Sequence, residues 1–441
     1  MGTAAATFRS LHLVEPEARP PRVTVAPPPR RWRGAALLAS LVVAAALNPL
    51  LPAMMASTGR AGTEFIALAL APLFALAASG GVGAWSRPVM RPMVAVAGIL
   101  ALSLAVGEHL KDGAVKLFVT LSGLAWAAAL VGERGRLARV AAWGAPLTLA
   151  LWAASAVTRD ALPRPSHMLA LAVLYARLIL DEEDRPRHLR PGEILVDVGL
   201  VGVIFLSTFR AATLAAGAAL VAAAARSRRA RWVLLLCGLC AAPALLVSTD
   251  REPTYSAAVA RDDWQGRYGS LGEDRLSGRA DIWENVWRDV QRSPAWLLTG
   301  HGAGDVDLYV ARVNPTYHAH LRGDERAVHT HNTALELFLS AGIWGLIPAA
   351  WLVLMAASRA RALGAQVGCS AGVLVVSMSN VPTLDWTGGT LLMAVWLYAL
   401  AATEGARSID PGARFAHGPA PRSHHDPPRT DPALPGREAL S

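Results

Sequence analysis

Three residues in the second half of the chain have side chains suited to group transfer at a phosphate. Arg210 and Arg279 carry guanidinium groups, which stay charged and offer paired donors to anionic oxygens. His331 carries an imidazole, which can accept a proton from a hydroxyl. Together they predict transfer from a lipid diphosphate to an acceptor hydroxyl. The alternative is that these arginines and this histidine are unrelated residues in and near a polar loop.

The residues after His331 predict the start of a helix. Asn332 precedes an apolar run, and Thr333 with Glu336 has the Thr-x-x-Glu spacing of a capping box. A helix that starts there would hold His331 in a fixed position. The positive end of the helix dipole would also favour the neutral imidazole, which is the form that accepts a proton.

The same segment has a second interpretation as a zinc site. Two His-x-His pairs with two acidic residues between them occur here: His318, His320, Asp324, Glu325, His329 and His331. Imidazole and carboxylate groups are common zinc ligands. Their spacing matches no established zinc motif, so we expect no metal.

An amphipathic helix is predicted upstream, from Arg279 to about Ser293. Apolar residues recur there every four positions, with tryptophans beside them: Ile282, Val286 and Val290, with Trp283 and Trp287. We expect this helix to lie on a membrane surface with its tryptophans at headgroup depth. Stacking of the tryptophans on sugars is the alternative.

The composition indicates which elements position these residues. Of 441 residues, 53% are hydrophobic and 17% are charged, and the apolar residues form twelve blocks. Each block is close to the roughly 20 residues that cross a hydrocarbon core. Continuous blocks exclude a soluble enzyme and a β-barrel. The net charge of +9 comes from arginines between the blocks and in the tails, so no nucleic acid partner is expected.

We therefore predict an all-α polytopic membrane protein with about twelve transmembrane helices. Residues 1–33 and 405–441 are polar tails, which we expect to be disordered. Residues 34–248 hold helices one to nine, residues 249–332 form a large periplasmic or extracellular loop, and residues 333–404 hold helices ten to twelve, the tenth over about 333–357.

Basic residues predict the orientation of these helices. One set of alternate connections carries fourteen arginines, including Arg229, and the other short set carries six basic residues, including Lys116. Because cytoplasmic connections hold the excess, both termini are expected in the cytoplasm, with the 249–332 loop and the corner at Arg210 on the outer face. Arg177 and Asp197 lie one turn inside the cytoplasmic ends of consecutive spans. They predict a structural ion pair, or snorkelling of Arg177.

The residues from about 200 to 350 resemble the O-antigen ligase and polymerase family. The most specific element is His331-Asn332, then nine residues, then Gly342-Ile343-Trp344-Gly345, which is similar to the ligases' His-Asn-x9-Gly-x-x-Gly signature. Two other stretches are similar to the loop of that family: Ser277-Gly278-Arg279 with Trp283, and Gly300-His301-Gly302. Ser207-Thr208-Phe209-Arg210 resembles a further segment, with Phe209 in place of the usual Ser.

The resemblance implies a GT-C-like membrane glycosyltransferase that needs neither metal nor cofactor. It would work in the bilayer of the bacterial inner (cytoplasmic) membrane and take a glycan from undecaprenyl diphosphate on the outer face. Arg210 and Arg279 would bind the diphosphate, and His331 would be the catalytic base or would orient the acceptor. Four residues would support them: Asn332, Glu336, Gly342 and Gly345.

The acceptor stays open at this point. Members of the family use lipid A-core, a growing polysaccharide or a protein. A carrier for a lipid-linked or anionic precursor is the competing class, although the polar residues gather at one surface and not at mid-membrane. An envelope scaffold protein is the third.

Overall fold

The computed structural model describes part of the chain, and most of the described residues are helical. The described residues are 33–43, 73–78, 85–131, 133–158, 167–184, 190–207, 210–248, 279–313, 330, 332–359, 364–379 and 389–405. Every regular element in these ranges is a helix, and no strand occurs among them. The predicted all-α class is confirmed for this part of the chain.

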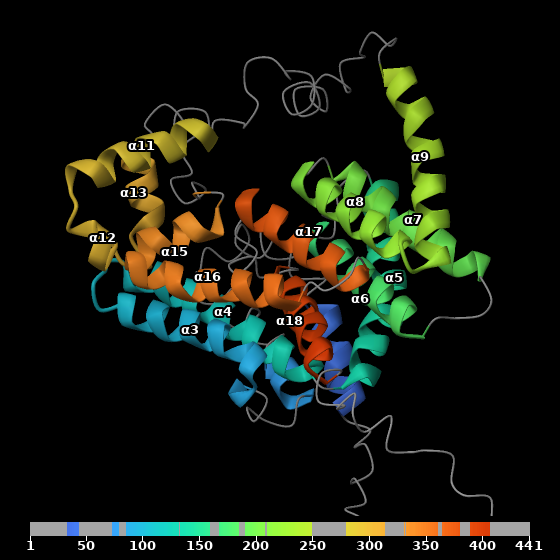
Figure 1. The fold of residues 1–441 in the computed structure, drawn as a ribbon, viewed down its shortest axis with the longest axis horizontal. Helices are drawn as coiled ribbons and strands as arrows, with labels where there is room; N and C mark the ends of the chain where they lie inside the picture. Colours follow the sequence, from blue (N-terminus) through green and yellow to red (C-terminus); the bar gives the residue numbers. More distant parts are fainter. Residues whose placement is uncertain are drawn as a thin grey trace, which may run out of the picture.

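The helices follow one another along the chain as shown in Figure 1. The first described helix is Arg33–Val43, residues 73–78 are also helical, and a short 3-10 helix, η2, spans Pro88–Met90. The others are α3 Arg91–Ser103, α4 Leu110–Leu130, α5 Arg134–Val157, α6 His167–Asp184, α7 Pro191–Leu206, α8 Arg210–Ala224, α9 Arg228–Ser248, α11 Arg279–Arg292, α12 Trp296–Thr299, α13 Val306–Val313, α15 Thr333–Ala341, α16 Ile343–Arg359, α17 Ala365–Ser379 and α18 Gly389–Gly405.

Most predicted spans from the third onward coincide with a helix, but the tenth is wrong. We predicted one helix over 333–357, whereas the structure breaks it at Gly342 into α15 and α16. Two helices are long and apolar enough to cross a membrane, Gly113–Leu130 and Arg134–Val157, and further described helices are apolar but shorter. The count of twelve and the orientation stay predictions.

The core of the bundle is formed by α6 and α18. Residues 168–176 of α6 and 391–400 of α18 are buried on all sides, as expected for helices that are apolar all round. Beside them, α17 packs closely on α8 through small residues. An added Cβ at Gly368 would lie 2.7 Å from Ala219 Cα, so glycine permits this close approach of two helices.

At one end of the bundle, α11, α12 and α13 form a layer that lies against α15 and the ends of α3, α4 and α16 (Figure 1). We call these three helices the loop layer. The predicted amphipathic helix is confirmed as α11. Val286 and Val290 of its apolar face are buried against α13 and α15, while Trp287 is 59% exposed. The apolar face of α11 therefore packs largely on protein.

Candidate active site

Asn332 fixes the start of α15. Its backbone is extended, and its side-chain oxygen accepts a hydrogen bond from the backbone N–H of Leu335 at 3.1 Å. This is the geometry of an N-cap. The predicted capping box is therefore wrong. Thr333 is the first helical residue, and the side chain of Glu336 is bound elsewhere.

A buried ion pair lies beneath that helix start. Lys116 Nζ of α4 lies 2.6 Å from Glu336 Oε1, and the two side chains are 8% and 1% exposed. Thr330 Oγ1 donates a hydrogen bond to Glu336 Oε2 at 2.8 Å. A buried charge is costly unless it is paired and hydrogen-bonded, so this network holds α4, Thr330 and α15 together. We had counted Lys116 among the connections, but it belongs to α4.

Trp283 joins the loop layer to Thr330, the residue just before His331. Its indole Nε1 donates a hydrogen bond to the carbonyl oxygen of Thr330 at 2.9 Å. Arg279 begins α11 one turn before Trp283, about 6 Å along the helix axis. The start of α11 therefore lies near the residues that flank His331. The sequence predicted that Trp283 anchors the helix in a membrane or stacks on a sugar. It did not predict the hydrogen bond to Thr330.

The three candidate chemical residues are described to different extents. His331 lies outside the described residues, but both of its neighbours, Thr330 and Asn332, are described and bonded. Arg279 and Arg210 are described as the first residues of α11 and α8, and their side chains lie outside the described part. The hydrogen bond from Trp283 to Thr330 brings α11 close to the described residue before position 331. Helix α8 packs on α17, which contacts α15, so the helix contacts of the described residues connect the start of α8 to α15 indirectly and show no direct contact between Arg210 and the other two residues.

The predicted zinc ligands also fall outside the described residues. This applies to His318, His320, Asp324, Glu325 and His329, as well as His331. Within the described ranges, no group of three or more His, Cys, Asp or Glu side chains is placed to hold a metal ion. The zinc interpretation therefore stays untested.

The two glycines of the signature have structural explanations. The nine residues between Asn332 and Gly342 are the nine residues of α15. Gly342 has φ +61° and ends that helix, and an added Cβ would lie 2.6 Å from Leu297 O of α12. A Cβ at Gly345 would lie 2.6 Å from the backbone carbon of Leu337. The spacing therefore sets the length of α15 and lets α16 turn back against it.

The Gly300-His301-Gly302 turn attaches the loop layer to α15 and to the turn after α3. The backbone N–H of His301 donates to Leu339 O at 2.7 Å, and that of Gly302 donates to Ser340 O at 3.2 Å. These bonds satisfy carbonyls in the last turn of α15. Gly302 has φ +92°, and an added Cβ would lie 2.5 Å from Gly107 Cα. We interpret this turn as a packing element.

An apolar groove of about 420 Å³ runs beside the candidate site. It lies between α11 and the pair α15 and α16, and its walls include Trp283, Trp287, Leu335 and Phe338. Asn332 lines the same groove. The groove therefore reaches the residue next to His331 on one side and the face of α11 on the other.

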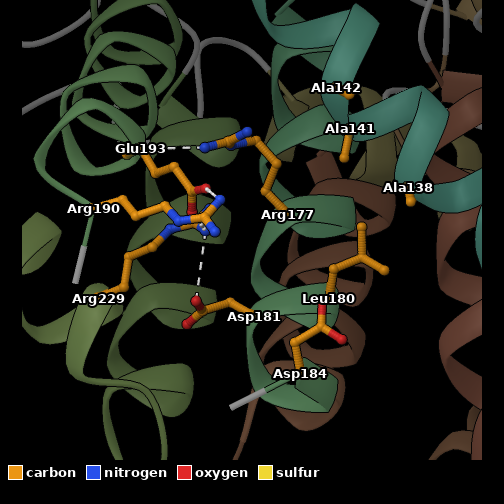
Figure 2. A pocket seen from close by; sticks show the side chains of 10 residues that line it. All are labelled: Ala138, Ala141, Ala142, Arg177, Leu180, Asp181, Asp184, Arg190, Glu193 and Arg229. Atoms are coloured by element: carbon orange, nitrogen blue, oxygen red, sulfur yellow. Dashed lines mark hydrogen bonds and ion pairs between the residues drawn. The ribbon is translucent and has the colours of Figure 1, made fainter. Parts of the chain in front are cut away.

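A second cavity, of about 410 Å³, lies among α5, α6, α7 and α9 (Figure 2). Arg177 pairs with Asp197, which confirms the predicted ion pair. Arg229 adds bonds that sequence reasoning missed, from Nε to Asp197 Oδ2 at 2.5 Å and from a terminal nitrogen to Glu193 Oε2 at 2.8 Å. We had placed Arg229 in a connection, but α9 begins at Arg228. Because these charges largely pair with one another, we interpret this cavity as structural.

The apolar helices and the loop layer over one end of the bundle are those of a helical membrane protein. The family model described as O-antigen ligase matches residues 195–350, which run from α7 to α16 and include Arg210, Arg279 and His331. This match agrees with the resemblance that the motifs indicated: over this segment the chain is similar to the O-antigen ligase family. A search of curated proteins found no match to the chain.

Proposed function

We propose that this protein transfers a glycan from undecaprenyl diphosphate to an acceptor hydroxyl on the outer face of the bacterial inner membrane. The family supports glycan processing at a membrane. The observation that carries the finer proposal is the hydrogen bond from Trp283 Nε1 to Thr330 O at 2.9 Å. It ties the helix that Arg279 begins to the residue before His331.

The proposed reaction exchanges one bond at the anomeric carbon of the glycan. The bond from that carbon to the diphosphate oxygen breaks, and a bond to the acceptor oxygen forms. The acceptor proton passes to His331, and undecaprenyl diphosphate leaves with the bonding electrons. His331 would act as general base, a role that typically contributes 10²–10⁴-fold to a rate.

Arg279 and Arg210 are proposed to bind the diphosphate. Negative charge grows on the leaving group as its bond breaks, and fixed cationic donors stabilise that charge without having to reorganise. A guanidinium can also form two parallel bonds to phosphate oxygens, which an ammonium cannot do. The start of α11 adds backbone N–H groups and the positive end of a helix dipole near Arg279.

The apolar groove beside α11 is proposed to receive the part of the polyprenyl chain nearest the diphosphate. Its walls are almost entirely apolar, and Asn332, one residue from His331, is among the residues that line it. A lipid seated there would place its diphosphate between the start of α11 and the start of α15. The acceptor would approach from the side of His331, and it could be lipid A-core, a polysaccharide or a protein hydroxyl.

Purified full-length protein in nanodiscs, supplied with its lipid-linked glycan, tests the proposal. Loss of donor together with a new glycosidic product supports a glycosyltransferase. Movement of intact donor between leaflets without product would instead support the carrier. A scaffold protein would yield neither result, and cells would tolerate replacement of Arg279 and His331.

A further inference from the structure

A third cavity, of about 570 Å³, lies between the loop layer and the turn that joins α3 to α4. Its walls come from α11, α12 and α13 on one side and from residues 106–109 on the other. Asp305 holds the two sides together, since its carboxylate accepts hydrogen bonds from the backbone N–H of Glu108 at 2.7 Å and of His109 at 3.2 Å. The cavity is therefore built from two segments about 200 residues apart in the chain.

One wall of this cavity is aromatic. The rings of His301 and Tyr309 stack with centroids 3.9 Å apart and planes at 23°, and the ring of Trp296 lies 3.9 Å from that of His301. All three side chains line the cavity. Aromatic faces of this kind offer apolar area with a polar edge, which suits the C–H face and hydroxyl rim of a sugar ring.

Two polar groups that line the cavity have hydrogen-bonding capacity that no described residue uses. Asp289 Oδ2 accepts a hydrogen bond from the Tyr309 hydroxyl at 2.9 Å, and no partner for its Oδ1 occurs among the described residues. His301 Nε2 is buried and likewise has no partner within the described ranges. Burial lowers the pKa of His301, so its ring is neutral near pH 7. A buried polar atom normally has a partner, and one without it suggests that a ligand or water supplies it.

We propose that this cavity is a sugar-binding subsite for a glycan that the enzyme processes. The assignment rests on the proposed function and deepens it. Asp289 lies six residues after Trp283 on α11, about 9 Å along the helix. The cavity would therefore hold a sugar beyond the one that reacts, with its hydroxyls donating to Asp289 and its ring against Trp296 and His301.

The charges of the cavity limit which sugar fits. Three carboxylates line it, those of Glu108, Asp289 and Asp305, against the guanidinium of Arg312 and the imidazole of His109, which contacts Asp305. Ionised carboxylates accept hydrogen bonds strongly from hydroxyl and ammonium donors and repel another carboxylate. We infer that the sugar is neutral or amino-substituted, and not a uronic acid. It belongs to either the donor glycan or a glycan acceptor, which share this chemistry.

Calorimetry on the full-length protein in nanodiscs tests the subsite without requiring transfer. The probe is the free oligosaccharide that mild acid releases from the lipid-linked donor. The wild type should bind it, and Asp289→Asn and Trp296→Ala should each weaken binding at least tenfold. Asp289→Asn keeps an acceptor for Tyr309 and should therefore fold normally. Glu284→Gln, on an exposed part of α11, is the matched control and should bind like wild type.

Kinetics identifies the source of the sugar. A raised KM for the donor in Asp289→Asn, with kcat little changed, assigns the subsite to the donor glycan, and a raised KM for the acceptor assigns it to the acceptor glycan. Failure of the wild type to bind the oligosaccharide, or equal binding by all variants, would overturn the subsite. Binding without any transfer would instead refute the proposed function and leave the subsite in place.

Discussion

Lys116 Nζ and Glu336 Oε1 lie 2.6 Å apart inside the protein, where α4 meets the first turn of α15. The pair is buried, and Glu336 also accepts the hydroxyl of Thr330. Through Thr330 the pair reaches the backbone next to His331. The ion pair therefore supports the position of the proposed base. Its lysine lies in α4, which is outside the residues that the family model matches.

Lys116→Met should destabilise the protein by about 3–5 kcal/mol, because it leaves the Glu336 carboxylate buried without its cation. Adding Glu336→Leu should recover much of the loss, since apolar replacement of both partners is often nearly neutral. Thermal unfolding in nanodiscs measures both variants. Arg288→Met is the control, because its pair with Glu284 is exposed and worth about 1 kcal/mol or less. Equal destabilisation by Lys116→Met and Arg288→Met would contradict this role of Lys116.

Trp283→Phe should lower glycan transfer about tenfold while leaving the protein folded. The change keeps an aromatic ring but removes the donor to Thr330 O, and loss of one such bond costs about 0.5–1.5 kcal/mol. Initial rates with saturating acceptor measure the effect. Trp351→Phe in α16, where the indole is 42% exposed, should keep the wild-type rate. A wild-type rate in Trp283→Phe would mean that this hydrogen bond does not position the site.

Arg279→Lys and Arg210→Lys should fold normally yet lose most transfer activity. Each keeps its charge but loses the paired donors of a guanidinium, and the loss should be larger at Arg279. Donor binding and turnover of the purified variants measure this. Near-normal turnover in Arg279→Lys would show that Arg279 serves only the start of α11.

Gly342→Ala should destabilise the protein by about 2 kcal/mol or more. Alanine at φ +61° is strained, and its Cβ would lie 2.6 Å from Leu297 O. Gly98→Ala provides the contrast, because nothing lies within 4 Å of a Cβ there, and alanine within a helix is favoured by up to about 1 kcal/mol. Thermal unfolding separates the two variants, and similar melting temperatures would refute the packing role of Gly342.

The sequence predicted much of the helical framework because apolar runs and helix signals are local. The amphipathic α11 and the start of α15 at Thr333 are examples. The break at Gly342 was missed because it depends on the approach of Leu297 from α12, a contact far along the chain. Gly342 in the signature was the feature of the sequence that could have indicated this break.

The supporting contacts of the site were less predictable. Lys116 is 220 residues from Glu336, and a lysine near a predicted helix end looks like a connection residue. Local spacing also favoured a capping box for Glu336, whereas Asn332 supplies the cap and leaves Glu336 for the buried ion pair. Pairings between distant helices leave no periodic trace in one sequence, so the structure was needed to find them.

The most direct test of the account is the transfer rate of His331→Ala beside that of His329→Ala, measured on purified, folded protein with the lipid-linked donor. If His331 removes the acceptor proton, its loss should lower transfer by about 10²–10⁴-fold with donor binding unchanged, and His329→Ala should lose much less. Wild-type transfer by a folded His331→Ala protein, or a larger loss in His329→Ala, would contradict the assignment of His331 as the base.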